Sequence, residues 1–143
     1  YRKSRGFLNL SYNKPGVKTS ESFVTTDKEY FLAAPRYTVN LGTYREVRKL
    51  IIGSTFTWLS EKYGQSQNYA QGLTPGLENT RYGSILLVNP SIGYKNLFKN
   101  VTVNLSVHNL FDQKYLLVQP SYGAHAPMPA NDRQMTLGAK LNL

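Results

Sequence analysis

The stretch that decides the fold is Asn100 to Leu110, which reads Asn-Val-Thr-Val-Asn-Leu-Ser-Val-His-Asn-Leu. Apolar and polar residues alternate along it, and side chains on a β-strand point alternately to its two faces. The apolar face would carry Val101, Val103, Leu105 and Val107, and the polar face Thr102, Asn104, Ser106 and His108. This stretch therefore predicts a β-strand with one apolar and one polar face.

Five other segments show a similar alternation, whereas apolar residues at helical spacing are rare. The segment that contains Pro90 is expected to bulge near Asn89, because proline lacks the N–H that a strand ladder needs. The sequence thus predicts six strands in all, the other five at Arg5–Asn13, Pro35–Arg45, Lys49–Tyr63, Arg81–Tyr94 and Arg133–Leu143.

The connections between these strands alternate in length. Long polar loops are expected at Val17–Glu29, Gly64–Thr80 and Leu117–Asn131, and short turns at Glu46–Arg48 and Lys95–Asn100. In an up-and-down sheet, the long loops then lie at one end and the short turns at the other. Several strands are about 10 residues long, as a tilted membrane strand requires.

Aromatic residues occur near the expected strand ends, where a transmembrane β-barrel carries its aromatic girdles. Together with the loop asymmetry, this placement favours an all-β, antiparallel transmembrane barrel with a polar interior. A soluble β-sandwich or small barrel with one face on a core remains an alternative. The girdle candidates are Tyr12, Tyr37, Tyr44, Trp58, Tyr63, Tyr94 and Tyr115.

Composition excludes several other classes of protein. The chain has 143 residues, a size typical of one domain, and it lacks cysteine, which excludes a disulfide scaffold and thiolate metal sites. The longest apolar run, Ile85–Val88, is far shorter than the ~20 residues of a membrane-spanning helix. No nucleophile, metalloprotease, phosphate-loop or dinucleotide motif is present, so we expect neither an enzyme, nor a cofactor, nor a bound metal. The net charge of +9 permits nucleic acid, anionic lipid or an anionic ligand as a partner.

One short segment resembles a family signature. Asn109, Leu110, Phe111, Asp112 and Tyr115 match the NLFD-x-x-Y motif near the C-terminus of TonB-dependent outer-membrane receptors. Three further segments resemble strands of the same family less closely and occur in the family's order: Ala34–Thr38, Leu50–Trp58 and Val88–Tyr94. In the last of these, Asn89 stands where the family commonly has Asp.

The resemblance implies a barrel of about 22 strands filled by an N-terminal plug. Residues 1–143 would then be about six C-terminal strands, or three hairpins, of that barrel, with the plug and TonB-contacting box in the rest of the receptor. The last strand would be the one that the outer-membrane assembly machinery reads, through Leu137, Leu141 and Leu143. Leu143 departs from the family, whose members usually end in Phe or Trp.

The resemblance further implies active transport across the outer membrane of a Gram-negative bacterium. The cargo would be a metal chelate, most commonly a ferric siderophore, with haem and other ligands also known in the family. The partners would be the rest of the receptor, the TonB complex, and outer-membrane lipid and lipopolysaccharide, but not nucleic acid. Two alternatives remain: a soluble basic β-sheet module for nucleic acid or an acidic glycan, and a TonB-independent porin or adhesin.

Candidate ligand contacts lie on the expected extracellular loops. Aromatic rings and a guanidinium suit a planar anionic chelate, and a loop histidine could contact a metal chelate or haem. Four lysines would lie toward the outer rim, where they would meet lipopolysaccharide phosphates or simply be solvated: Lys14, Lys18, Lys28 and Lys62. The candidate mouth residues are Tyr63, Tyr69, Arg81, Tyr122 and His125.

Overall fold

The computed structural model describes residues 2–16, 23–25, 28–68, 76–120 and 126–141. They form one antiparallel six-stranded sheet in the order β1-β2-β3-β6-β7-β10, and two small two-stranded sheets, β4-β5 and β8-β9. Within these ranges no helix is long and apolar enough to cross a membrane. The large sheet contains β1 (Arg2–Tyr12), β2 (Tyr37–Val47), β3 (Leu50–Leu59), β6 (Ile85–Tyr94), β7 (Val101–His108) and β10 (Gln134–Leu141).

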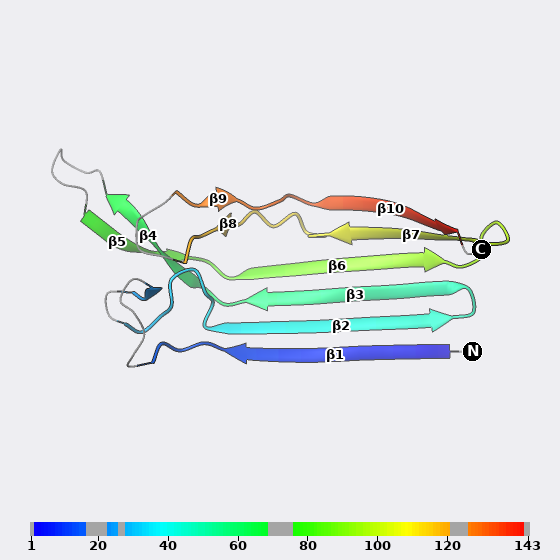
Figure 1. Cartoon of the computed structure of the whole chain (residues 1–143), viewed down its shortest axis with the longest axis horizontal. Helices are drawn as coiled ribbons and strands as arrows, with labels where there is room; N and C mark the ends of the chain where they lie inside the picture. Colours follow the sequence, from blue (N-terminus) through cyan, green and yellow to red (C-terminus); the bar gives the residue numbers. More distant parts are fainter. Residues whose placement is uncertain (1, 17–22, 26–27, 69–75, 121–125, 142–143) are drawn as a thin grey trace.

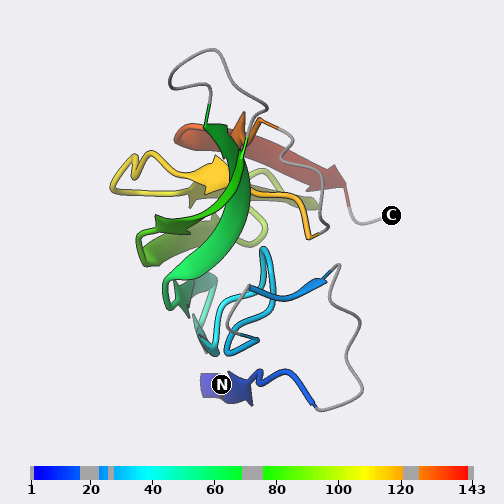
Figure 2. The same ribbon diagram turned by 90° about the vertical axis from the view of Figure 1, so that its left-hand side faces the viewer.

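The two small sheets lie at one end of the large sheet, which we call the loop end (Figure 1). They pair β4 (Lys62–Asn68) with β5 (Gly76–Tyr82), and β8 (Leu116–Leu117) with β9 (Met128–Pro129). Viewed from the loop end, the long strands follow one curved layer with β1 and β10 at its two edges (Figure 2). The sheet is an up-and-down meander that does not close on itself, and its antiparallel all-β architecture agrees with the predicted fold class.

The register gathers apolar side chains on one face of the sheet, which we call the apolar face. Leu105 of β7 pairs with Ile92 of β6 and with Leu137 of β10, so the apolar positions form rows across the strands. These side chains are not covered: Leu137 is 74% exposed and Leu10 is 70% exposed. Contiguous apolar surface of this kind marks a face that contacts a partner or lipid. A second row consists of Leu8, Leu41, Phe56 and Val88.

The opposite face, the polar face, carries small and hydrogen-bonding residues. Thr57 Oγ1 donates to Asn40 Oδ1 at 2.9 Å, and Asn89 Nδ2 donates to Thr55 Oγ1 at 3.1 Å. This division of polar and apolar side chains confirms the predicted faces of the strands.

The predicted placement of aromatic residues at the strand ends is confirmed in part. The rings of Tyr12 and Tyr37 lie 5.2 Å apart at the loop end of the apolar face. Trp58 pairs with Val39, two residues inward from Tyr37. Tyr94 lies at the other end of the same face. Tyr44, Tyr63 and Tyr115 were wrongly placed in the girdle: Tyr44 lies on the polar face and donates to Glu46, Tyr63 belongs to β4, and Tyr115 precedes β8.

Several of the predicted boundaries are wrong, and the chain's local geometry explains why. The expected strand Lys49–Tyr63 ends at Leu59, because Ser60 closes the β2–β3 ladder. The Ser60 N–H donates to the Tyr37 carbonyl at 3.0 Å, and Ser60 Oγ accepts from the Tyr37 N–H at 3.1 Å. β4 then begins in a separate sheet.

The expected loop Gly64–Thr80 therefore holds most of the β4–β5 hairpin, and the expected strand at Arg81 begins instead at Ile85. The loop expected at Leu117–Asn131 likewise contains β9. The expected turn Glu46–Arg48 moves to Arg48–Lys49, because β2 pairs as far as Val47 and Arg48 adopts φ 57°.

Pro90 interrupts only one side of β6. On the β3 side the register runs unbroken through Pro90, so the bulge expected near Asn89 is absent from that ladder. On the β7 side, however, the ladder contains only the four residues from Ser91 to Tyr94. Strand pairing between β6 and β7 therefore stops next to the proline, which has no N–H to donate.

Candidate functional site

Two of the predicted mouth residues meet on the β4–β5 hairpin at the loop end. Tyr63 of β4 pairs directly with Arg81 of β5. Arg81 is 64% exposed and forms an ion pair with Glu61 at 3.0 Å. The hydrogen bond that Arg81 donates to the Glu61 carboxylate raises the pKa of Arg81 further above its ordinary value, so the guanidinium is permanently charged. The hairpin thus presents one aromatic ring and one cation side by side.

Two further residues that the sequence did not single out join this pair. The rings of Tyr30 and Tyr63 lie 4.6 Å apart, and the Arg36 guanidinium carbon lies 4.2 Å from the centre of the Tyr30 ring. Such stacking of a guanidinium on a tyrosine face is a cation–π contact. Arg36 is also held by the Tyr30 hydroxyl and the Glu29 carbonyl, each at 3.2 Å. We call Tyr30, Arg36, Glu61, Tyr63 and Arg81 the Tyr–Arg cluster.

Backbone bonds fix the Tyr–Arg cluster in place. Leu32, which is only 2% exposed, forms a parallel bridge with Tyr63, and the Ala33 N–H donates to the Tyr63 carbonyl at 2.7 Å. The segment before β2 is therefore tied to β4. Sequence reasoning missed Tyr30 and Arg36 because backbone bonds to β4, about thirty residues later in the chain, place this connection beside Tyr63.

The Tyr–Arg cluster can hold an anion that has flat or aromatic parts. It offers two guanidinium groups and two phenol rings, with Glu61 offsetting one of the two positive charges. The Arg36 Nε atom is buried and has no hydrogen-bond partner among the residues that the structure describes, so this guanidinium retains an unused donor there. Among the described residues, no group of three or more His, Cys, Asp or Glu side chains is placed to hold a metal ion.

The segment from Asn109 to Tyr115, which we call the clasp, connects β7 to β6 and β10 through hydrogen bonds. Asn109 is completely buried, and its amide bonds to both the N–H and the carbonyl of Gln113 at 3.0 Å. Its own N–H donates to Asn89 Oδ1 of β6 at 2.8 Å. The N–H of Leu110 donates to the Val88 carbonyl at 2.9 Å. The turn that follows β7 therefore restores the connection to β6 that Pro90 prevents.

Asp112 extends the same clasp to β10. Its Oδ1 accepts from the Arg133 N–H at 2.8 Å, directly before β10, and its other oxygen pairs with Lys114 at 3.1 Å. These contacts hold the pKa of Asp112 below its ordinary value, the Arg133 hydrogen bond most of all and then Lys114. Phe111, by contrast, is 67% exposed. The Tyr115 carbonyl accepts a hydrogen bond of 3.0 Å from the Ala130 N–H.

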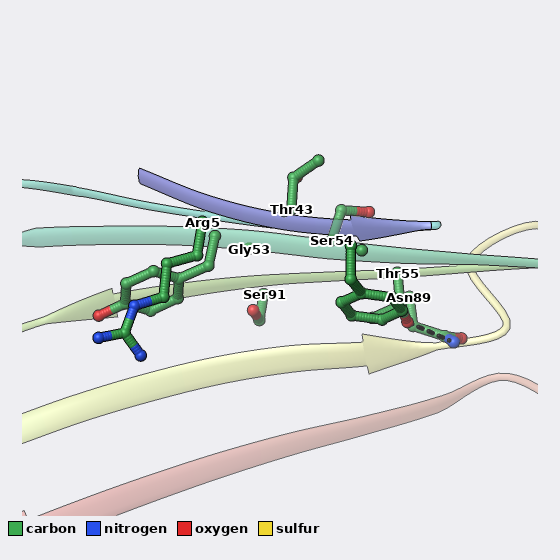
Figure 3. Close-up of a pocket in the computed structure, with 11 residues that line it drawn as sticks. Arg5, Thr43, Gly53, Ser54, Thr55, Asn89 and Ser91 are labelled. Atoms are coloured by element: carbon green, nitrogen blue, oxygen red, sulfur yellow. Dashed lines mark hydrogen bonds between the residues drawn. The ribbon is translucent and has the colours of Figure 1, made fainter. Parts of the chain in front are cut away.

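A hollow of about 480 Å³ lies on the polar face. Glycine makes room for it, since a Cβ on Gly42 would overlap the Phe7 ring and one on Gly53 would lie 2.9 Å from Ser91 Oγ. Figure 3 shows Arg5 and Ser91 on this side of the sheet and Thr43 on the other, with Asn89 bonded to Thr55 beside the hollow. The hollow carries one charged group, the Arg5 guanidinium, and was not anticipated from the sequence.

The remaining predicted residues divide into three groups. Leu137 and Leu141 lie on β10 as expected, exposed by 74% and 61%. Lys14 and Lys28 are exposed, whereas Lys62, also expected at the outer rim, is buried. Four candidates and one rim lysine lie outside the described residues: Tyr69, Tyr122, His125, Leu143 and Lys18.

The comparisons with known proteins identify similar structures but no similar sequences. No protein-family model matches the chain, and no curated protein matches it. The chain is similar to the closed form of the ferric-catecholate import receptor Fiu from Escherichia coli K12, with a TM-score of 0.72 and 20% sequence identity. That match covers 96% of this chain and 18% of the receptor.

The chain is also similar to the ferripyoverdine receptor of the outer membrane of Pseudomonas aeruginosa, solved with ferripyoverdine bound. Here the TM-score is 0.65 at 17% identity, over 79% of this chain and 15% of the receptor. The chain thus spans less than a fifth of the length of either receptor. It has the fold of one part of such receptors, as the motif resemblance predicted.

Proposed function

We propose that this chain is the C-terminal part of the barrel wall of a TonB-dependent outer-membrane receptor that imports a ferric siderophore. The observation that carries the proposal is the structural match to an import receptor over 96% of the chain. The aligned part of the chain is longer than the six strands of the large sheet together, so the match also includes residues outside that sheet. The NLFD-x-x-Y segment, which closes β7 and reaches β6 and β10, supports the same assignment.

The apolar face supports a position in the outer membrane. A soluble sheet covers its apolar face with a second layer. Here the described residues leave large side chains open on that face, including Leu105 at 43% and Ile92 at 48% exposure. Lipid would cover them, and the tyrosines and tryptophan at the strand ends would lie at the interface with water. The same exposure argues against the alternative of a soluble basic β-sheet module.

The Tyr–Arg cluster supplies the part of the mouth that would meet the cargo. Ferric siderophores present an anionic or polar metal core surrounded by flat chelating groups. The rings of Tyr30 and Tyr63 would contact the flat groups, and Arg36 and Arg81 would attract the negative charge. The chain would therefore contribute binding and a rigid wall, while energy coupling would come from the TonB complex acting on the plug.

Uptake by cells tests the proposal. The full receptor that contains this chain is expressed in a strain lacking its own catecholate receptors, and a catecholate loaded with radioactive iron is added. We expect accumulation in the receptor-bearing cells and none after deletion of the TonB gene. Accumulation that persists without TonB would favour the porin alternative. Absence of uptake with catecholate, hydroxamate and hydroxycarboxylate chelates alike would overturn the proposal.

A further inference from the structure

Lys62 is a buried cation at the start of β4. The residue is 7% exposed, and its ammonium group donates to the Leu116 carbonyl of β8 at 2.9 Å. This contact joins the β4–β5 hairpin to the segment after the clasp. A carbonyl oxygen supplies a hydrogen bond but no negative charge, so the cation is only partly compensated.

Lys114, which lies nearby, is a lysine whose positive charge is balanced by carboxylates. Lys114 pairs with Asp112 at 3.1 Å and with Asp132 at 2.7 Å. Lys62 forms no ion pair with any residue of the described ranges, and burial alone lowers the pKa of Lys62. Removing an ammonium group from water is unfavourable unless an anion lies beside it. The position beside Lys62 is therefore suited to a negative group that the described part of the chain does not supply.

A cavity of about 210 Å³ opens at this position. Lys62 and Ile85 are its buried members, while Gly83, Ser84 and Lys114 are exposed around it. Tyr82, Tyr115 and Leu116 complete the lining. The cavity is smaller than the roughly 300–1,000 Å³ of a drug-sized pocket, so it suits one small molecule or one ring.

The cavity is separate from the Tyr–Arg cluster. Lys62 pairs with Tyr82, and Tyr63 pairs with Arg81, in consecutive positions of the same hairpin. Neighbouring residues on a strand point to opposite faces. The β4–β5 hairpin thus presents the Tyr–Arg cluster on one face and the cavity on the other.

We propose that this cavity is a binding site for a small aromatic carboxylate, with Lys62 bonding the carboxylate. The two tyrosine rings, Ile85 and Leu116 would pack against the aromatic part. Lys114 adds positive charge near the entrance, although two aspartates already pair with it. The site stands on the geometry of β4, β5 and β8, and its existence does not depend on what the receptor imports.

Benzoate and 4-bromobenzoate test the site on the full receptor purified in detergent. Calorimetry measures benzoate affinity, and crystals soaked in 4-bromobenzoate locate the bromine by its anomalous scattering. Lys62→Met removes the charge and keeps an unbranched apolar side chain. Lys49→Met is the matched control, because Lys49 is an exposed lysine in the β2–β3 turn at the opposite end of the sheet.

We expect benzoate to bind wild type and Lys49→Met equally. It should bind Lys62→Met at least about tenfold more weakly, because one charge-assisted hydrogen bond is lost. The bromine should lie between Tyr82 and Tyr115. Neutral benzamide should bind as weakly to wild type as benzoate does to Lys62→Met. Equal benzoate affinity in Lys62→Met, equal affinity for benzamide and benzoate, or bromine density only elsewhere would each overturn the proposal.

Discussion

Asn89 Oδ1 accepts a hydrogen bond of 2.8 Å from the backbone N–H of Asn109, where the β6–β7 ladder has already ended beside Pro90. A side chain thus takes the place of a missing backbone partner. The same amide donates to Thr55 on β3, so Asn89 connects three strands of the sheet.

Replacing Asn89 tests this connection. Asn89→Ala leaves the Asn109 N–H without an acceptor, and an unsatisfied buried donor costs about 1–3 kcal/mol. Asn89→Asp keeps the acceptor and should cost less, which would also account for Asp being common at this position in the family. The measurement is the temperature at which the full receptor loses its folded mobility on a detergent gel. Equal losses in the two variants would contradict the role of the acceptor.

Asn109 contributes both its side chain and an unusual backbone conformation. Its φ is 54°, a left-handed conformation that glycine adopts freely and alanine adopts at a cost of about 1–2 kcal/mol. Asn109→Gly should therefore lose only the two side-chain hydrogen bonds to Gln113, at about 1 kcal/mol each. Asn109→Ala should lose the same bonds and add the strain. The same gel assay should rank Ala below Gly, and the reverse order would refute the strain argument.

Asp112 makes the clasp sensitive to acid. Because its pKa in the folded protein lies below the ordinary value of about 4, its contribution to stability is present at neutral pH. The contribution is lost as the pH falls through the folded-state value. The difference in unfolding temperature between wild type and Asp112→Asn should therefore be largest near neutral pH and shrink in acid. Asp132→Asn, which leaves the Arg133 contact intact, should differ less from wild type in unfolding temperature. If the difference between wild type and Asp112→Asn did not change with pH, this account would be contradicted.

Arg81 and Glu61 should affect ligand binding in opposite directions. If the Tyr–Arg cluster binds an anionic ferric catecholate, Arg81→Gln removes an attractive charge and Glu61→Gln releases the guanidinium from its ion pair. Because exposed pairs are worth about 0–1 kcal/mol, each change should be about two- to fivefold. Quenching of receptor fluorescence by the chelate measures both affinities. A loss of affinity in Glu61→Gln would show that the ion pair positions Arg81 rather than competing for it.

The strands that the sequence predicted best are those with strict alternation and no competing contact. β7 and β10 lie within two residues of their predicted limits among the described residues, because both faces of each strand have one consistent environment. The sequence signals only the end of the apolar face, where Ser60 and Lys62 follow Trp58, and a strand can continue beyond such a point. The backbone contacts of Ser60 with Tyr37, which end the strand, have no local signature.

The candidate site was predicted by residue type rather than by arrangement. Tyr63 and Arg81 were chosen as an aromatic ring and a cation on one loop, and they lie opposite each other only because that loop is a hairpin. Glycine, glutamine and asparagine made the segment look irregular, although backbone pairing alone can hold such a hairpin. The sequence placed Lys62 at a solvated rim. Its burial could not be predicted, because it depends on a contact with β8, more than fifty residues later in the chain.

The central claim is that the apolar face of this sheet lies against lipid, and spin labels test it most directly. The chain has no cysteine, so single cysteines at Val103, Asn104, Leu105 and Ser106 can be labelled in the full receptor once any cysteine outside this chain is removed. The labels are then compared in lipid vesicles for collisions with oxygen, which concentrates in lipid, and with a water-soluble nickel complex. We predict that the labels at Val103 and Leu105 meet oxygen, and that those at Asn104 and Ser106 do not. Equal access of the nickel complex to all four positions would contradict the account.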